Sequence, residues 1–128
     1  MNKLFALVVL FCLTSMVSQL DAQSINNRNW IASFGNPIND SLILHVQSDS
    51  TYVTNSSGDV IIHTSFTISG DTLSILDKGT GEHECPDMVG KYKINLDGNS
   101  FMLTVIDDPC EGRGQALNGV KWTETMKK

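Results

Sequence analysis

The sequence lacks the short motifs that carry enzyme chemistry. It contains no P-loop, no Gly-x-Gly-x-x-Gly run, no His-Glu-x-x-His pair, and no serine or cysteine in a nucleophile elbow. Asp107 and Asp108 stand before Pro109, a setting in which a carboxylate usually caps a turn by accepting backbone N–H groups. We therefore expect no catalytic residue, no cofactor and no enzymatic activity.

Positive charge is also scarce. Nine Lys and Arg residues are outnumbered by 14 Asp and Glu residues, the formal net charge is −5, and no basic cluster occurs. The electrostatic footprint of a nucleic-acid-binding protein is therefore missing, and so is the basic patch that docks proteins on anionic membranes. We expect no nucleic-acid partner.

Metal ligands in a recognisable spacing are absent as well. His45, His63 and His83 fall in three separate predicted elements. The run Glu82-His83-Glu84-Cys85 lies in a predicted loop, where consecutive side chains rarely coordinate one ion. We predict that the histidines are surface residues and that the chain holds no metal site.

A long apolar run occurs only at residues 4–13, and ten residues are too few to cross a bilayer, which needs about 20. Lys3 precedes this run and a small-residue cleavage site follows at Ala22, as in secretory signal peptides. We therefore expect residues 1–22 to be cleaved and residues 23–128 to form one secreted or periplasmic domain without a membrane span. A lipoprotein anchored through Cys12 is the alternative, but Phe11 stands where a small residue normally precedes such a cysteine.

Cysteine is rare, and one of the three cysteines leaves with the signal peptide. Cys85 and Cys110 then remain in an oxidising compartment, where a pair is expected to form a disulfide. Closing a loop of this length stabilises a fold by about 3 kcal/mol in the chain-entropy model. The alternative, two free thiols or half of a zinc site, lacks the Cys-x-x-Cys or histidine spacing that zinc requires.

Alternating apolar and polar residues after the signal peptide indicate β-strands. The clearest run is 91–96, in which Tyr92, Ile94 and Leu96 alternate with polar residues. Clusters of Gly, Asn, Asp and Ser separate the runs, and a short helical turn is expected at 115–118. The eight predicted strands cover residues 28–34, 41–47, 50–54, 60–68, 72–76, 91–96, 100–106 and 119–125.

Eight short antiparallel strands with one apolar face favour closure, because open sheet edges invite aggregation. We therefore predict an all-β fold, an up-and-down antiparallel barrel of about eight strands with one disulfide. The interior of such a barrel is just wide enough to be filled by side chains or to hold one small ligand. The residues predicted to point inward and to line a ligand site are Leu42, Leu44, Ile62, Phe66, Leu73, Ile75, Tyr92, Ile94, Phe101, Leu103 and Val105.

Two tryptophans, Trp30 and Trp122, lie near opposite ends of the exported domain, which suggests that the first and last strands meet. Arg113 is expected to lie across an indole face, where a cation–π contact is worth roughly 0.5–2 kcal/mol. We predict that these three residues close the barrel and have no catalytic role.

Several short motifs resemble those of small secreted bacterial lipocalin-like proteins, within the wider calycin group. The Asn29-Trp30 start is similar to the Gly-x-Trp of lipocalins, with Arg28 at the glycine position. A pairing of Arg113 with Trp30 would resemble the arginine-on-tryptophan contact of calycin proteins. The motifs that carry the resemblance are Gly70-Asp71-Thr72-Leu73, Cys85-Pro86, Gly90-Lys91-Tyr92, Phe101-Met102-Leu103-Thr104-Val105, Asp108-Pro109-Cys110, Arg113, Leu117 and Trp122.

This resemblance implies a barrel that binds a small apolar molecule in its interior. Small calycin barrels with one disulfide are also similar to inhibitors of secreted metalloproteases, in which a flexible N-terminal arm fills the protease cleft. A protein-binding module with residues 23–27 as its arm is therefore the alternative, although the same residues are also expected to be a disordered terminus. A structural envelope protein without any ligand is the third hypothesis.

Overall fold

The computed structural model describes residues 24–48 and 50–126, so the expected signal peptide and its cleavage site lie outside the described residues. This part of the chain forms an all-β barrel with one helix, and no helix in it is long and apolar enough to span a membrane. The elements are β1 (Arg28–Phe34), β2 (Asp40–Val46), β3 (Thr51–Thr54), β4 (Val60–Ser69), β5 (Thr72–Asp77), β6 (Val89–Asp97), β7 (Ser100–Asp107), α2 (Glu111–Leu117) and β8 (Lys121–Thr125).

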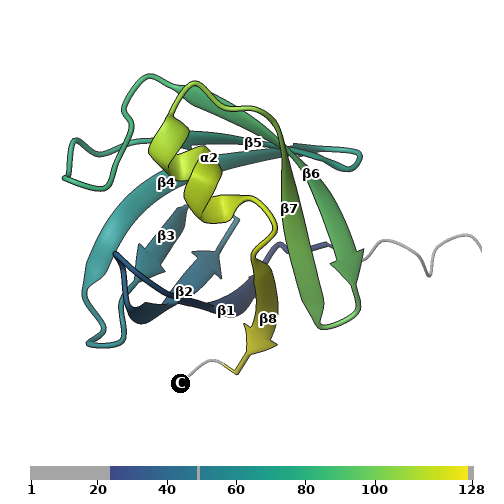
Figure 1. The fold of residues 1–128 in the computed structure, drawn as a ribbon. Coiled ribbons are helices and arrows are strands. Elements are labelled where there is room, and N and C mark those ends of the chain that lie inside the picture. Colours follow the sequence, from purple (N-terminus) through teal and green to yellow (C-terminus); the bar gives the residue numbers. More distant parts are fainter. Residues whose placement is uncertain (1–23, 49, 127–128) are drawn as a thin grey trace, which may run out of the picture.

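Each strand pairs antiparallel with its neighbours in the sequence, and the barrel closes because β1 also pairs with β8. The register places Trp30 opposite Leu44 of β2 on one side and opposite Glu124 of β8 on the other. In Figure 1 the strands curve round a common interior, and α2 lies in front of it. The predicted eight-stranded up-and-down barrel is confirmed, and so is the meeting of the first and last strands.

β6 and β8 begin at other residues than predicted, because strand pairing or backbone conformation decides where they begin. β6 begins at Val89 because Val89 and Gly90 continue the ladder with β5, opposite Leu76 and Ile75. β8 begins only at Lys121, because Gly119 has a φ of 77° and this left-handed conformation interrupts an extended strand.

Helix α2 is longer than the turn predicted at 115–118, since it begins at Glu111. Residue propensities do not predict this helix, because it contains Gly112 and Gly114 and glycine is a poor helix former. Its start is fixed by tertiary structure instead. Cys110 stands directly before the helix and is bonded to Cys85 in the β5–β6 loop, which confirms the predicted disulfide.

The topology gives the barrel two different ends. The β1–β2, β3–β4 and β5–β6 loops lie at one end together with α2, and we call this the open end. The N-terminal segment and the β2–β3, β4–β5 and β6–β7 turns lie at the opposite end, which we call the closed end. Every strand therefore runs from one end to the other and supplies side chains to both.

Ile25 seals the closed end. Its side chain is only 1% exposed, and its backbone oxygen accepts a hydrogen bond of 3.1 Å from Trp30 Nε1. Trp30 is itself fully buried and meets Phe101 edge-on, with 4.8 Å between ring centroids. The expectation of a free arm or a disordered terminus is therefore wrong for residues 24–27, because the apolar surface that Ile25 buries favours a fixed position.

Arg28 ties the first strand to the last. Its guanidinium carbon lies 4.3 Å from the centroid of the Trp30 ring, its Nε donates to Glu124 Oε2 at 2.7 Å, and its Nη2 donates to Gly98 O at 2.9 Å. The arginine over Trp30 is thus Arg28, and the prediction that Arg113 pairs with this tryptophan is wrong. The physical reason is position, because Arg113 lies in α2 at the open end of the barrel.

We predict that Ile25→Ala lowers the free energy of unfolding by roughly 2–4 kcal/mol, because truncating a buried isoleucine leaves a cavity. Ile38→Ala is the matched control, since Ile38 is 40% exposed and its loss should matter by less than about 0.5 kcal/mol. Urea unfolding measures both variants. Equal losses would show that Ile25 does not seal the barrel.

Candidate ligand-binding site

A cavity of about 900 Å³ enters the barrel from the open end. Small-molecule sites in proteins usually measure roughly 300–1,000 Å³, so this cavity is large enough for one ligand. Its walls come from the strands, its rim from the β1–β2 and β5–β6 loops, and one side from α2. Its apolar lining consists of Phe34, Leu42, Leu44, Val53, Ile61, Ile62, Phe66, Ile75, Leu103, Ala116, Leu117 and Trp122, with Pro37 and Ile38 at the rim.

Some of the residues predicted to line a ligand site do line this cavity. Leu42, Leu44, Ile62, Phe66, Ile75 and Leu103 line the cavity. Leu73, Tyr92 and Phe101 are almost fully buried in the core and do not line the cavity, and Ile94 packs against that core. Leu73 and Phe101 lie near the closed end of their strands, whereas Tyr92 lies near the open end and is turned to Asp108, to which its hydroxyl group donates.

Val105 does not line the cavity, in contrast to the prediction. It is 37% exposed and lies beside Gly114 of α2, and its backbone N–H donates to Asn118 Oδ1 at 3.0 Å. The register of β6 and β7 shifts beyond Val105, so Ile106 is left without a partner on β6. This irregularity ends the alternation on which the prediction rested.

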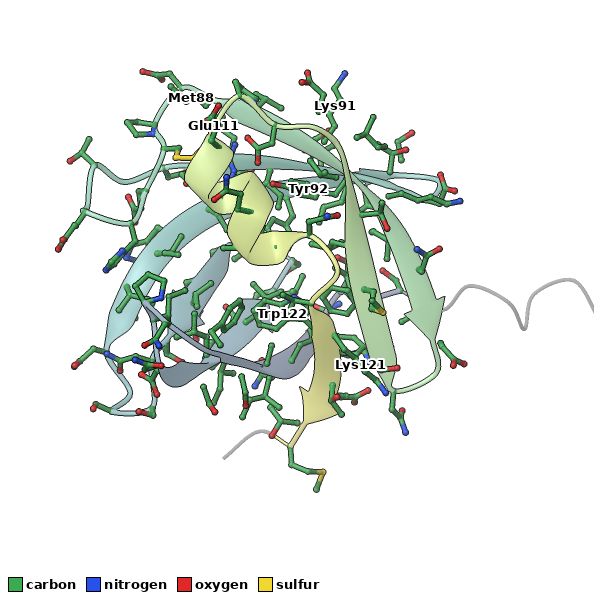
Figure 2. All side chains as sticks on the ribbon, viewed as in Figure 1. Met88, Lys91, Tyr92, Glu111, Lys121 and Trp122 are labelled. Carbon is green, nitrogen blue, oxygen red and sulfur yellow. A yellow bond between two sulfur atoms is a disulfide. The ribbon has the colours of Figure 1, made fainter. Side chains whose placement is uncertain are left out.

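An aromatic column of four rings, Trp30, Phe101, Trp122 and Phe34, connects the closed end to the cavity. Phe101 stacks on Trp122 with 6.2 Å between centroids and 9° between planes, and Phe34 meets Trp122 at 5.7 Å and 64°. Trp30, Phe101 and Trp122 belong to the buried core and Phe34 packs against it, and of the four rings Trp122 and Phe34 also line the cavity. Figure 2 shows Trp122 on the inner side of β8, below α2, with the adjacent Lys121 pointing outward. Trp122 therefore belongs to both barrel closure and the cavity wall.

Arg113 holds α2 on the barrel through a bidentate ion pair. Its Nε donates to Asp108 Oδ2 and its Nη2 donates to Asp108 Oδ1, both at 2.8 Å, while the Asp108 side chain is completely buried. Nη2 also donates to Met88 O at 2.7 Å, which ties the helix to the end of the β5–β6 loop. Tyr92 donates a hydrogen bond from its hydroxyl group to Asp108 Oδ2. Figure 2 shows Tyr92 close behind α2.

The same network includes the disulfide. The backbone N–H of Cys110 donates to Asp108 Oδ1 at 2.9 Å, and that of Cys85 donates to Asp77 Oδ2 at 2.8 Å. Arg113 lies between the two carboxylates, with its Nη1 3.3 Å from Asp77 Oδ2. The covalent bond and the buried ion pairs therefore fix one unit, the wall of the cavity formed by α2 and the β5–β6 loop.

Burial and hydrogen bonding shift the pKa in opposite directions for Asp108 and Arg113 and in the same direction for Tyr92. For Asp108, burial raises the pKa, but hydrogen bonds from Arg113, Tyr92 and the Cys110 N–H together hold the pKa below its usual value. For Arg113, burial lowers the pKa, and the bond and charge of Asp108 outweigh this and raise it. For Tyr92, burial and then Asp108 raise the pKa well above its ordinary value. Asp108 and Arg113 therefore stay charged at neutral pH.

The rim of the cavity is acidic. Asp40, Asp77, Glu82 and Glu84 line it, and hydrogen bonds from Ser56 lower the pKa of the Asp40 carboxyl. Of the described residues that line the cavity, Arg113 is the one with a permanent positive charge.

The histidines do not converge. His45 stacks on Tyr52 with 4.4 Å between ring centroids, His63 is exposed, and His83 belongs to the rim of the cavity. In residues 24–48 and 50–126, no group of three His, Cys, Asp or Glu side chains is placed to hold a metal ion.

Sequence reasoning missed the ion network. Its assignment of Asp108 to a turn is confirmed by the bond from the Cys110 N–H, but it did not single out Asp77 and it placed Arg113 on an indole ring. Gly90 was the local sign in the sequence that could have indicated this network. A Cβ at this position would lie 2.7 Å from Asp108 Cγ and 3.0 Å from Arg113 Nη2. A glycine inside a strand often marks such a close approach.

Comparison with protein-family models, with curated proteins and with solved structures finds no significant match to this chain. The lipocalin-like resemblance therefore stays a prediction, and the interpretation of the site depends on its own geometry.

We predict that Gly90→Ala destabilises the protein by roughly 1–3 kcal/mol, because the new methyl group forces Asp108 and Arg113 apart. Gly112→Ala is the matched control, since a Cβ there meets nothing within 4 Å and lies in a helix, where alanine is favoured by up to about 1 kcal/mol. Thermal unfolding under oxidising conditions compares the two. A harmless Gly90→Ala would contradict the close packing of the network.

The ion pair also predicts a pH dependence. Because the folded state lowers the pKa of Asp108, the stability it contributes is present above the unfolded value of about 4 and is lost as the pH falls through the lowered value. Asp108→Asn should be less stable at neutral pH, and its deficit should shrink below about pH 4. Urea unfolding of both chains across this range measures the difference. A deficit that is constant with pH would contradict the charged pair.

Proposed function

We propose that this protein is an exported lipocalin-like barrel that binds a small apolar ligand inside its open end. The cavity of about 900 Å³ carries this proposal, because its walls are mainly apolar and the opposite end of the barrel is sealed. A purely structural barrel of this size has no need of such a space, since side chains can fill an eight-stranded interior completely.

The asymmetry of the barrel supports a binding role. At the closed end, Ile25, Trp30 and Phe101 fill the interior and are at most 1% exposed. Leu42 and Leu44 belong to the same core but also line the cavity. Apolar walls around an accessible space favour transfer of an apolar molecule from water at about 25 cal/mol per Å² of surface removed from water.

The disulfide between Cys85 and Cys110 supports an extracellular or periplasmic location, because such bonds persist in oxidising compartments. The apolar run at residues 4–13 supports the same location. A carrier or sensor of an apolar molecule outside the cytoplasm or in the cell envelope is the function that agrees with both.

Titration with the uncharged fluorophore N-phenyl-1-naphthylamine tests the proposal. The oxidised protein should raise the fluorophore's emission with saturable one-to-one binding. Ala116→Trp places a large ring from α2 into the cavity and should weaken binding at least tenfold. Glu111→Trp is the matched control, because it adds the same ring on the same helix at an exposed position outside the lining.

Three outcomes of this titration distinguish a ligand in the cavity from the other hypotheses. Loss of binding in Ala116→Trp alone supports a ligand in the cavity. Equal binding by both variants and the unchanged chain would place the fluorophore elsewhere and contradict the proposal. Absence of binding to the unchanged chain would favour the structural hypothesis instead.

A further inference from the structure

The excess negative charge of the described residues lies at the open end of the barrel. Charges of the two signs balance at the closed end, where the described ionic residues are Asp71, Asp97, Glu124, Arg28, Lys93 and Lys121. The basic residues described at the open end are Lys78, Lys91 and Arg113. They are outnumbered by the acidic residues described there, which are Asp40, Asp59, Asp77, Glu82, Glu84, Asp87, Asp107, Asp108 and Glu111.

Part of this excess charge belongs to the mouth of the cavity. Asp40 at the start of β2 and Glu82 and Glu84 in the β5–β6 loop are among the residues that line it. Glu84 is fixed by the backbone N–H groups of His63 and Gly81, which donate to its carboxylate at 2.9 and 3.3 Å. Glu82 is exposed and makes no hydrogen bond or ion pair among the described residues, so its charge is uncommitted.

The positive charge of the lining is already neutralised. Arg113 donates from Nε to Asp108 Oδ2 at 2.8 Å, and its Nη1 lies 3.3 Å from Asp77 Oδ2. Two carboxylates therefore face one guanidinium group, and the ion network of the wall is itself negative. An anionic ligand finds no uncommitted positive charge among the described residues of the cavity.

Apolar walls and an acidic mouth place different demands on a ligand. Charges of one sign at the mouth of a low-dielectric cavity focus the electric field there, which attracts cations and repels anions. The apolar interior gives a charged group nothing to replace its hydration, so such a group is stable only near the mouth. The cavity is the independent indication that a ligand exists, and the charges determine only the sign of the ligand's polar group.

We infer that the ligand of this cavity is an amphipathic cation, an apolar molecule that carries one protonated amine or quaternary ammonium group. Its body occupies the apolar interior, and its charged group stays at the mouth, near Asp40, Glu82 and Glu84. This inference rests on the proposed binding function and deepens it by stating the chemical class of the ligand. A fatty-acid anion of similar size would bring its carboxylate against the carboxylates of the rim and would bind more weakly.

Three naphthalenes of similar shape test the inference. At neutral pH, 2-(aminomethyl)naphthalene is a cation, 2-ethylnaphthalene is uncharged and 2-naphthoate is an anion. Their affinities are measured by displacement of N-phenyl-1-naphthylamine from the oxidised protein and from the double variant Glu82→Gln/Glu84→Gln, which removes two charges from the mouth. The double variant Asp71→Asn/Asp97→Asn is the matched control, because it removes two charges from turns at the closed end.

We expect the amine to bind the unchanged chain at least tenfold more tightly than 2-naphthoate at low salt. Glu82→Gln/Glu84→Gln should weaken the amine about three- to tenfold, strengthen 2-naphthoate and leave 2-ethylnaphthalene unchanged, since only the charged ligands interact with the lost carboxylates. The closed-end control should leave all three affinities within about twofold, because its charges lie farther from the cavity.

Salt provides a second measurement that needs no variant. About 0.5 M sodium chloride screens exposed charges, so it should narrow the difference between the amine and 2-naphthoate and leave the hydrocarbon nearly unaffected. If Glu82→Gln/Glu84→Gln does not fold, this salt titration of the unchanged chain still decides. A difference between the two ligands that does not change with salt would overturn the inference.

The outcomes distinguish this inference from the proposed function. Absence of fluorophore binding would overturn both. Binding of the fluorophore, with the amine no better a competitor than 2-naphthoate at low salt, would overturn the inference alone. Equal weakening of the amine by the rim variant and by the closed-end control would also overturn it, because the effect would then come from the net charge of the protein.

Discussion

Pairing of β1 with β8 is the constraint on which the rest of this protein depends. Arg28 strengthens that seam by covering Trp30 and bonding Glu124 across it. With the seam closed, Ile25 and Phe101 can fill the interior at one end. The apolar surface buried there supplies stability that the other end does not have to provide, and a cavity can be left open at the opposite end.

The open end is organised by charge as well as by apolar packing. Leu117 packs against the core, but helix α2 has no buried residue and contains two glycines, so neither deep burial nor propensity holds it in place. Arg113 and Asp108 do so through a buried bidentate pair, and the Cys85–Cys110 bond fixes the neighbouring loop. Breaking a buried pair by removing one partner is far more disruptive than losing a surface pair, so this arrangement keeps the cavity wall in one position.

Trp122 links these two halves of the molecule. Its ring continues the aromatic column of Trp30, Phe101, Trp122 and Phe34 from the core to the cavity wall.

The sequence by itself determined the barrel, the strands and the disulfide, because period-two alternation and a cysteine pair are local signals. It also marked Leu42, Leu44 and Ile62 as inward-facing. Only the tertiary structure decided which of the inward residues also line the cavity, since this depends on how all eight strands and α2 are placed. The prediction placed Arg113 over Trp30, where the structure has Arg28, and the physical reason for this error is the same. The placement of α2 at the open end pairs Arg113 with Asp108, whereas Arg28 at the start of β1 lies over Trp30.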